Sequence, residues 1–332
     1  MQIGTVKLSN AVILAPLAGI TNLPFRRIAK AAGCGLVCSE MISANGLVHG
    51  SRKTLDMLTS HPDEAPLSVQ LFGADPDITA AAAEMAAAAG AHILDINFGC
   101  SVKKIVKTGS GVALMKDPGR AARLLRAVRR AVAIPLTIKI RSGWDSSGIQ
   151  ALEIAGIAQD CGVDALAVHP RTAAQGFRGR ADWTLIGRVK QALDIPVIGN
   201  GDIQTYRDAL RMMAETACDG IMVGRAAIGN PLLLGQIVTA LAGGTPGSVS
   251  WEARMAIMEQ YLQASVIYLG VTTACRIMRS RLGWFVKGLP HNRDFREAIR
   301  HLASQAEALE HITAYRSRIL PLESRATHAQ DG

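Results

Sequence analysis

Cys100 is the side chain in this sequence that is best placed to do chemistry. It comes directly after Asn97-Phe98-Gly99, at the point where an apolar run of the chain ends. A thiol is mostly protonated at neutral pH unless its surroundings lower its pKa, so it can serve as a proton donor. The alternative is a buried structural cysteine, which suits Cys34, Cys161 and Cys218 because they lie at or near helix–strand junctions. We therefore expect Cys100 to be catalytic.

Polar residues and glycines follow most other apolar runs of the chain in the same way. One such residue could be a satisfied structural group, but a set at six or more strand ends indicates a common site, because the C-terminal ends of the strands meet at one face of a barrel. The candidates are Ala15, Pro16, Leu17, Gln70, Asn97, Lys139, Arg141, His169, Asn200, Gly201, Asp202, Gly224 and Arg225.

The last two strand ends, at Asn200-Gly201-Asp202 and at Gly224-Arg225, suit a bound phosphate group. Gly201 and Gly224 let backbone N–H groups approach an anion closely, and Arg225 adds a positive charge. Lys139 can stabilise negative charge on a reduced ring system. A phosphorylated cofactor with several ring carbonyl and N–H groups, such as a flavin, would also suit the polar side chains at two further strand ends, Gln70 and Asn200.

A basic block lies between Ser101 and Arg141. It holds eleven lysines and arginines against one acid, Asp117, which accounts for the whole formal charge of +9. Such a block indicates a polyanionic partner. For the part from Arg120 to Arg130, the alternative is a solvated helix face on the outside of the fold.

Eight short apolar runs recur through the first two thirds of the chain. Most are continuous in Val, Ile, Leu and Ala and do not alternate with polar residues, which is typical of parallel strands buried on both faces. The runs are Ala11–Ala15, Leu36–Ser39, Leu67–Leu71, Ile93–Asn97, Leu136–Ile140, Ala165–His169, Val197–Asn200 and Gly220–Val223.

Segments with helical spacing separate these runs, among them Ala80–Ala89, Arg120–Val132 and Tyr206–Glu215. Alternation of strand and helix about eight times in residues 1–242 favours a parallel (β/α)8 barrel, an α/β fold. The same strands could instead form a doubly wound open sheet. Such a sheet usually has a Gly-x-Gly-x-x-Gly motif after its first strand, and this sequence has none there. The sequence therefore predicts a TIM barrel.

The pattern changes after Ala242. Residues 243–250 are rich in Gly, Ser, Thr and Pro and are expected to form a linker. Residues 251–320 have helical periodicity in three segments, 251–269, 272–287 and 293–317, and predict a small all-helical domain. We expect residues 321–332 to form a flexible tail.

Other classes of protein are disfavoured by composition. No apolar run reaches membrane-spanning length, and the first ten residues lack the pattern of a signal peptide. The six cysteines include no Cys-x-x-Cys pair, which argues for reduced thiols in the cytoplasm and gives no indication of a metal site. We expect a monomer without bound metal.

Several short segments of the chain, taken in order, resemble the signature set of the tRNA-dihydrouridine synthases, in particular the bacterial branch that includes the B-type enzyme. The resemblance runs from about Ile3 to Pro290, and its later part lies in the expected helical domain. The segments are Ala15-Pro16-Leu17-Ala18-Gly19-Ile20-Thr21, Asn97-Phe98-Gly99-Cys100, Lys139-Ile140-Arg141, His169-Pro170-Arg171-Thr172, Asn200-Gly201-Asp202-Ile203, Gly224-Arg225-Ala226-Ala227 with Gly229-Asn230-Pro231, and Arg281-Leu282-Gly283-Trp284-Phe285.

The resemblance implies a barrel that binds FMN, uses NADPH as reductant and reduces the 5,6 double bond of a flipped uridine in tRNA. Hydride would pass from N5 of the flavin to C6, and the proton from Cys100 to C5. It implies cofactor contacts from Ala15, Pro16, Leu17, Gln70, Lys139, His169, Asn200, Gly201, Asp202, Gly224 and Arg225. From their own positions and chemistry, we expect Asn97 and Arg141, at neighbouring strand ends beside Cys100, to contact the uracil. We expect the basic residues Lys103, Lys104, Lys107, Arg279 and Lys287 to contact the tRNA.

One position departs from the family pattern. Ser101 stands where the family usually has proline after the active cysteine, so we expect a slightly looser loop at Cys100. Two alternative functions remain. A dihydroorotate dehydrogenase-like enzyme would act on a free pyrimidine, but it would not explain the basic block or the helical domain. A non-catalytic RNA-binding protein would need neither Cys100 nor the cofactor residues.

Overall fold

Eight parallel strands close into a barrel, as the sequence predicts. The computed structural model describes residues 1–328, with side chains to residue 323. The strands lie in the order β10-β3-β4-β5-β6-β7-β8-β9, and every neighbouring pair is parallel. Their bounds are β3 Val12–Leu14, β4 Leu36–Ser43, β5 Leu67–Phe72, β6 Ile93–Phe98, β7 Leu136–Gly143, β8 Ala165–Thr172, β9 Val197–Asn200 and β10 Gly220–Val223.

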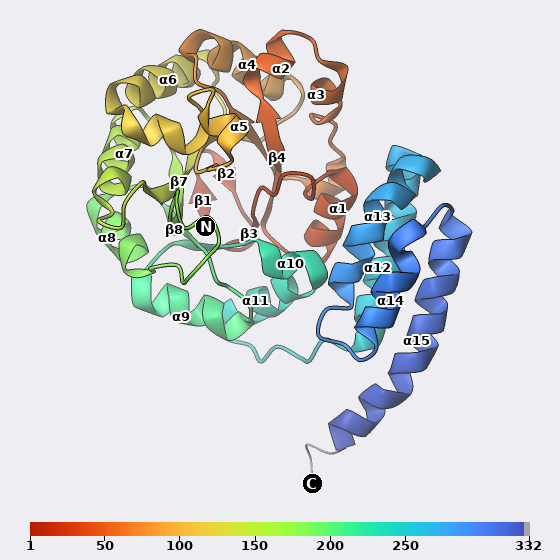
Figure 1. Cartoon of the computed structure of the whole chain (residues 1–332). Coiled ribbons are helices and arrows are strands. Elements are labelled where there is room, and N and C mark those ends of the chain that lie inside the picture. The colour runs from red at the N-terminus through yellow and green to blue at the C-terminus, as the bar shows by residue number, and fades with distance from the viewer. Residues whose placement is uncertain (329–332) are drawn as a thin grey trace.

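A ring of helices covers the outside of the barrel (Figure 1). The apolar outward side chains of the strands pack against these helices in one continuous core. The helices of the barrel part, of which α5 lies at the rim of the mouth, are α1 Leu23–Ala31, α2 Ala44–Val48, α3 Arg52–Asp56, α4 Pro76–Ala88, α5 Lys103–Val106, α6 Pro118–Ala131, α7 Ile149–Asp160, α8 Thr184–Ala192, α9 Tyr206–Thr216, α10 Arg225–Gly229 and α11 Leu233–Leu241, with 3-10 turns η1 Pro62–Glu64 and η2 Gly111–Lys116.

Side chains alternate across each strand, which sorts the barrel into layers. In β6, Leu94, Ile96 and Phe98 belong to the outer core, whereas Ile93 belongs to a separate cluster inside the barrel. Asp95 shares the inward face with Ile93 because strand side chains have a period of two. The barrel interior is thus apolar at the base and polar towards the C-terminal ends of the strands.

A short antiparallel hairpin, β1 Gln2–Ile3 with β2 Val6–Lys7, closes the base of the barrel. Ile3 and Leu8 are buried with the inner cluster. The sequence did not predict this hairpin, because two-residue strands carry no measurable periodicity. Its place at the base leaves the opposite end of the barrel, which faces the viewer in Figure 1, as the open mouth.

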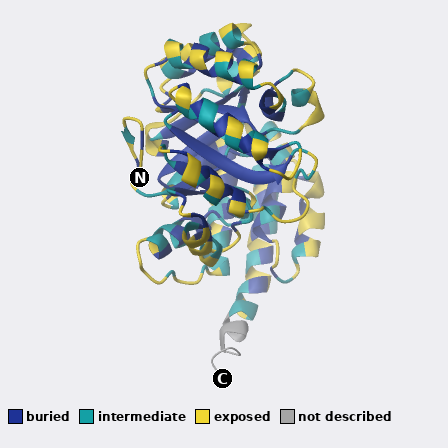
Figure 2. Ribbon diagram, turned by 90° about the vertical axis from the view of Figure 1, so that its left-hand side faces the viewer, coloured by how far each residue is buried: buried dark blue, intermediate teal, exposed yellow. Residues whose placement is uncertain are grey.

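Three strands run several residues further than their apolar runs predict, and β5 and β6 run one residue further. β4 extends to Ser43, β7 to Gly143 and β8 to Thr172. Figure 2 shows that the sheet remains buried along its length. Arg141 and His169 therefore lie inside strands, where backbone pairing fixes their direction, and not in loops.

Five helical elements follow the segment 244–250, which has no regular structure. They are α12 Trp251–Leu269, α13 Val271–Phe285, α14 Asn292–Ala298, the 3-10 turn η3 Ile299–His301 and α15 Gln305–His328. The expectation of one helix over 293–317 was wrong. The chain breaks near Leu302, and a new helix starts because Ser304 accepts the N–H of Glu307 while Glu307 accepts the N–H of Ala303.

The expected tail from residue 321 also differs from the structure. Helix α15 continues through Pro321 to His328. Glu323 accepts a 2.7 Å hydrogen bond from the N–H of Trp251, which ties this turn to the start of α12. The remaining tail residues, 329–332, lie outside the described residues.

The helical part and the barrel share buried contacts. Phe25 of α1 meets Tyr261 of α12 edge to face at 5.4 Å. Arg281 of α13 donates to the carbonyl of Gly19 and to the hydroxyl of Tyr261. The two parts therefore form one packed body along α1. No helix in the described part of the chain is long and apolar enough to cross a membrane.

Candidate active site

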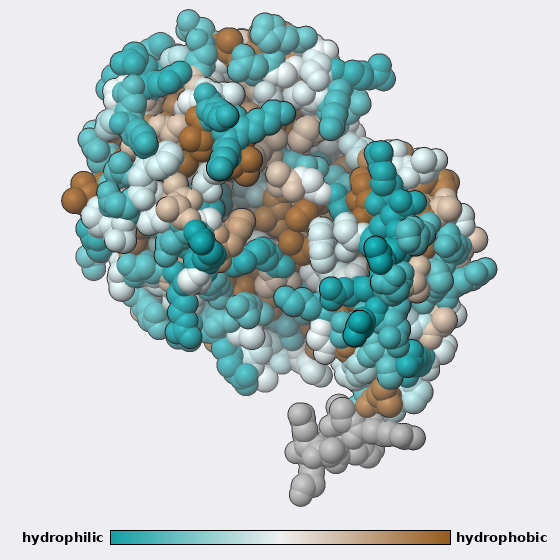
Figure 3. Space-filling view, viewed as in Figure 1, coloured by the Kyte–Doolittle hydropathy of each residue, from teal (hydrophilic) through white to brown (hydrophobic). Residues whose placement is uncertain are grey.

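The predicted site residues converge on the open mouth of the barrel. Side chains of β5 to β9 reach it from the inward face, and the loops after β3, β9 and β10 form its rim. Figure 3 shows a hollow at the centre of this face, with hydrophobic surface inside it and hydrophilic surface around it. One end of one fold therefore gathers residues that are up to 210 positions apart in the sequence, from Ala15 to Arg225.

The backbone of Cys100 is held on both sides. Its N–H donates to Asn97 Oδ1 at 2.8 Å, and its carbonyl accepts the N–H of Val112 at 3.0 Å. Gly111, at φ +63°, lies so close that a Cβ there would be 2.5 Å from the Cys100 oxygen. The loop is thus fixed without the proline that Ser101 replaces.

The thiol of Cys100 is half-buried. Burial raises its pKa, and this effect outweighs the opposing effects of the Val102 N–H and the Arg141 charge. The group therefore stays protonated through neutral pH, as a proton donor must.

Asn97 supports the cysteine loop with its side chain. Its Oδ1 also accepts the N–H of Gly99 at 3.1 Å, and its Nδ2 donates to Gln70 Oε1 at 2.9 Å. Gln70 in turn donates to Asp95 Oδ2 at 2.6 Å and is 0 % exposed. In this arrangement the Gln70 amide faces Asp95 and Asn97 and is not open to the mouth.

Arg141 holds three backbone carbonyls. Its Nε donates to Gly99 O at 2.6 Å, and its Nη1 donates to Gly176 O at 2.8 Å and to Thr172 O at 3.3 Å. Its Nη2 has no hydrogen-bond partner among the described side chains and backbone. Arg141 therefore fixes the Cys100 loop from below and keeps one donor free.

Lys139 is a cation without a hydrogen bond or ion pair in the described residues. Burial, helped by the charge of Arg141, lowers its pKa to about 8, although Asp95 works in the opposite direction. An ammonium group in this state still carries its charge for most of the time at pH 7. It is available to an electron-rich group that enters the mouth.

His169 is neutral at physiological pH. Burial, then the charges of Lys139, Arg141 and Arg171, lower its pKa to about 2. Arg171 Nη1 lies 3.2 Å from His169 Nε2. Arginine can only donate, so Nε2 must accept and the ring proton must sit on Nδ1. That N–H has no partner among the residues described, and it leaves the mouth with a neutral donor.

Arg171 is a site residue that the sequence analysis did not assign. It is almost fully buried and forms a two-pronged contact with Asp202, with Nη2 at 2.7 and 2.8 Å from the two oxygens. Burial works to raise the pKa of Asp202, but the Ala181 N–H and Arg171 outweigh it and lower the pKa. The period of two along β8, from His169 to Arg171, is the signal that could have found it.

The loops after β9 and β10 leave open space at the rim. A Cβ on Gly224 would meet nothing closer than 3.8 Å, at Ala15 and Leu17. Gly201, at φ +120°, packs against His169 so closely that a Cβ would lie 2.9 Å from its Cδ2. Asn200 donates to Met222 O at 2.8 Å, and its Oδ1 has no hydrogen bond within the described chain.

The first loop of the mouth, residues 15–21, is held by side chains from three directions. Thr21 Oγ1 accepts the N–H of Leu17 at 3.1 Å, Glu40 accepts the N–H of Gly19, and Arg281 donates to the carbonyl of Gly19. Pro16 therefore sits on a fixed loop beside the space at Gly224.

Phe177 is a second residue that the sequence analysis missed. It lies on the loop after β8, is 58 % exposed, and stacks on His169 with ring centroids 6.1 Å apart. The guanidinium of Arg225 lies 4.8 Å from the ring centroid, and that of Arg141 lies 5.6 Å from it. Arg225 also approaches Asp202 at 3.6 Å but remains half-exposed.

The residues expected to bind tRNA are exposed but lie on two separate parts. Lys103 and Lys104 belong to α5, which lies at the upper rim of the mouth in Figure 1, and Lys107 follows it. Arg279 and Lys287 lie on or just after α13. The Arg279 guanidinium already donates to Leu302 O at 2.8 Å, so part of its capacity is used.

The basic block of the sequence is not a single surface. Lys139 and Arg141 point into the barrel, whereas Arg120 and Arg129 are bound to Ala74 O and Asp164 on the outside. The other, exposed arginines of α6 lie on the outer wall of the barrel, because this helix packs its apolar face on the barrel. Sequence proximity therefore overstated how many of these charges face one partner.

Solved structures share the fold at low sequence identity. A morphinone reductase variant in complex with tetrahydroNAD aligns with a TM-score of 0.52 and 15% identity, over 74% of this chain and 91% of that one. A histamine dehydrogenase from Rhizobium sp. 4-9 aligns with a TM-score of 0.56 and 13% identity, over 80% and 50%. These similarities show the barrel fold alone.

Sequence relatives are much closer and span nearly the whole chain. A probable tRNA-dihydrouridine synthase of Rickettsia bellii is 40% identical over 325 residues, 97% of this chain and 100% of the relative. The tRNA-dihydrouridine synthase B of Xanthomonas campestris is 42% identical over 302 residues, 90% of each chain. Residues 13–320 match the family described as Dihydrouridine synthase (Dus). The chain therefore belongs to the dihydrouridine synthase family and resembles its bacterial B type.

Proposed function

We propose that this protein is an FMN-dependent tRNA-dihydrouridine synthase that uses NADPH and reduces one uridine of tRNA. The observation that carries the proposal is a half-buried Cys100 thiol, its pKa raised by burial, on a fixed loop at a mouth with unpaired donors and acceptors. The names of the relatives in the family support the substrate class. A free pyrimidine, the alternative substrate, would leave the exposed lysines of α5 without a role.

The groups at the mouth fit a flavin phosphate and ring. The open space at Gly224 and the half-exposed Arg225 suit a phosphate. Lys139, the Nδ1–H of His169 and Asn200 Oδ1 supply a cation, a neutral donor and an acceptor for the ring. Gln70 faces away, so we assign it to the support of Asn97 in place of direct contact.

The chemistry that FMN supplies when bound and reduced is hydride transfer to C6 of the uracil ring. The protein must then deliver a proton to C5, so that the double bond is lost and two C–H bonds form. Cys100 can give up its thiol proton to C5, which leaves a thiolate that solvent reprotonates. His169 is not a suitable acid, because its ring is neutral at pH 7 and the remaining N–H of a neutral imidazole is a very weak acid.

The direct test is to map dihydrouridine in tRNA from a strain that lacks this protein, with and without the protein supplied again. We expect one position to lose dihydrouridine and to regain it with the wild-type chain. A full set of dihydrouridines in the deletion strain would reject the proposed function. Yellow, FMN-containing protein on purification would separate an enzyme from a non-catalytic RNA-binding protein.

The Arg225→Ala variant should retain FMN more weakly. A charge-assisted hydrogen bond contributes about 1.5–3 kcal/mol, so we expect the dissociation constant to rise about 10- to 100-fold. Fluorescence titration of the apoprotein with FMN measures it. Arg207→Ala is the matched control, since Arg207 is exposed on α9 and stacks only on Tyr206. Unchanged FMN affinity in Arg225→Ala would remove Arg225 from the phosphate site.

The salt dependence of tRNA binding should show whether the lysines in and just after α5 contact phosphates. Each phosphate contact that is lost lowers the slope of log K against log salt by about 0.7–0.9. A Lys103→Ala, Lys104→Ala, Lys107→Ala triple variant should therefore lower it by roughly two to three units. The control changes three exposed arginines of the outer wall to alanine: Arg123, Arg126 and Arg130. A loss of slope in the control but not in the lysine variant would place the tRNA on α6 instead.

A further inference from the structure

We propose that Asp95, a buried carboxylate beneath the mouth, is a positioning residue that orients the Cys100 loop through Gln70 and Asn97. The inference rests on the proposed role of Cys100. Asp95 itself touches neither the thiol nor the open mouth, because it lies two residues below Asn97 on the inward face of β6.

A continuous line of hydrogen bonds joins Asp95 to the backbone of Cys100. Gln70 Nε2 donates to Asp95 Oδ2 at 2.6 Å, and Asn97 Nδ2 donates to Gln70 Oε1 at 2.9 Å. Asn97 Oδ1 then accepts the N–H groups of Cys100 and Gly99, at 2.8 and 3.1 Å. The strand register supports this line, since Gln70 of β5 stands directly beside Asp95 of β6.

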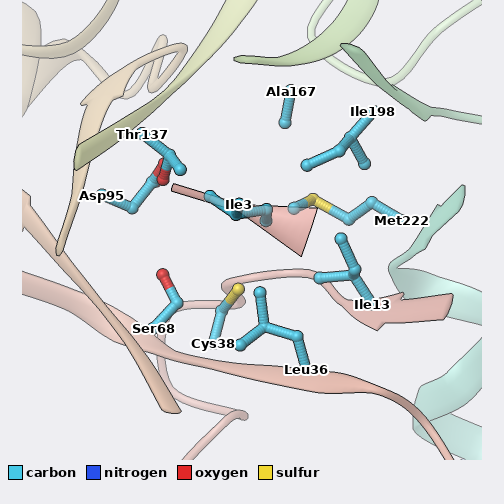
Figure 4. Close-up of a pocket in the computed structure, with 10 residues that line it drawn as sticks. All are labelled: Ile3, Ile13, Leu36, Cys38, Ser68, Asp95, Thr137, Ala167, Ile198 and Met222. Atoms are coloured by element: carbon cyan, nitrogen blue, oxygen red, sulfur yellow. The ribbon is translucent and has the colours of Figure 1, made fainter. Parts of the chain in front are cut away.

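The direction of every amide in this line is fixed from both ends. Backbone N–H groups can only donate, so Asn97 must turn its oxygen to the cysteine loop and its nitrogen to Gln70. Gln70 must then turn its oxygen to Asn97 and its nitrogen to an acceptor. Asp95 Oδ2 is that acceptor, and Thr137 Oγ1 donates to the other oxygen of Asp95 at 2.6 Å. Figure 4 shows Asp95 and Thr137 side by side at the edge of the inner cavity.

Water cannot easily replace Asp95 in this role. Asp95, Gln70 and Asn97 are all buried. The cavity that Asp95 lines is about 10 Å³, which is no more than one water requires. Without an acceptor at position 95, the Gln70 Nε2 group becomes a buried donor without a partner, so Gln70 is no longer held in the place where its Oε1 accepts from Asn97. Asn97 then loses its own support, and the contact of its Oδ1 with the Gly99 and Cys100 N–H groups weakens.

The first test compares Asp95→Leu with Asp95→Asn in the flavin-loaded protein. In Asp95→Asn, the new amide can turn its oxygen to Gln70 and its nitrogen to Thr137, whose hydroxyl can donate to Leu94 O, so this variant preserves the line. We expect faster hydrogen exchange at the Gly99 and Cys100 amides in Asp95→Leu only. The rate of flavin reoxidation by uridine-containing tRNA should fall about 10²-fold in that variant, the cost of a misplacement of about 1 Å.

The second test moves the negative charge one position along the line. Gln70→Glu alone sets two carboxylates side by side and should disturb the loop. In the double variant Gln70→Glu, Asp95→Asn, the new amide at position 95 donates to the new carboxylate at position 70, which still accepts from Asn97. We expect the double variant to recover the exchange protection that Gln70→Glu loses. This rescue keeps the proposal testable even if Asp95→Leu does not fold.

Ser68→Ala is the matched control, because Ser68 lines the same cavity but has no part in the line. Unaltered exchange at residues 99 and 100 in folded Asp95→Leu, or no rescue in the double variant, overturns the role of Asp95. Failure of the proposed function has a different signature. The wild-type protein would then show protected amides but no flavin reoxidation by tRNA.

Discussion

Cys100→Ala should bind FMN and tRNA, accept hydride from NADPH at a nearly normal rate, and then fail at the second half-reaction. Flavin reoxidation by uridine-containing tRNA should slow by about 10²–10⁴-fold, the usual contribution of a positioned general acid. The physical reason is that the thiol is held protonated by burial beside the mouth, and His169 cannot replace it because its pKa is lowered to about 2. Stopped-flow absorbance of the flavin separates the two half-reactions.

Two variants control for this result. Cys275→Ala removes a thiol that is buried in α13, away from the mouth, and should behave as the wild type. Cys100→Ser keeps a small polar group with a much weaker acid and should resemble Cys100→Ala. Rapid reoxidation with normal dihydrouridine yield in Cys100→Ala would remove the thiol from the mechanism and leave a bound water as the donor to examine.

Arg141→Ala should produce the other large loss. The change removes the donor that holds Gly99 O at 2.6 Å and frees the loop carbonyls at Thr172 and Gly176. It also removes the free Nη2, which we propose contacts the uracil. Uridine reduction should fall by about 10²-fold or more, since displacement of a reacting group by about 1 Å has that cost. Flavin reduction by NADPH should remain nearly intact.

Arg120→Ala is the matched control for Arg141, because its Nε also holds one backbone carbonyl, Ala74 O at 2.9 Å, outside the mouth. Arg141→Lys tests geometry against charge, since lysine keeps the charge but lacks the planar fork. An equal fall of both half-reactions in Arg141→Ala would make Arg141 a flavin residue and not a substrate residue.

The sequence predicts the barrel well because its strands are buried on both faces and are therefore continuously apolar. The runs Val197–Asn200 and Gly220–Val223 match β9 and β10 at both ends. The predicted ends of β7 and β8 were too early, because their last inward residues are polar and look like loop. Those polar residues are the ones that line the mouth, so the boundary error and the functional signal have the same cause.

Partnerships between side chains could not be predicted from motifs. Asn97 and Gln70 look like free amides for a ligand, but the fold turns them towards Cys100 and Asp95. Arg171 is hidden inside a recognised motif, and its ion pair with Asp202 depends on the closure of β8 against β9. Such contacts join residues that are close only after the strands pair, which no local pattern records.

The contact between Arg281 and Gly19 has a consequence for how the chain is made. Its partners are 262 residues apart, and Phe25 of α1 packs edge to face on Tyr261 of the same helical part. A ribosome that adds about 5–20 residues per second completes every barrel strand well before these covering helices emerge. During that interval the nascent barrel displays an uncovered aromatic face on α1 and a first loop without its last anchor. Chaperone occupancy should therefore be highest on nascent chains between about residue 223 and residue 285, the ends of β10 and α13.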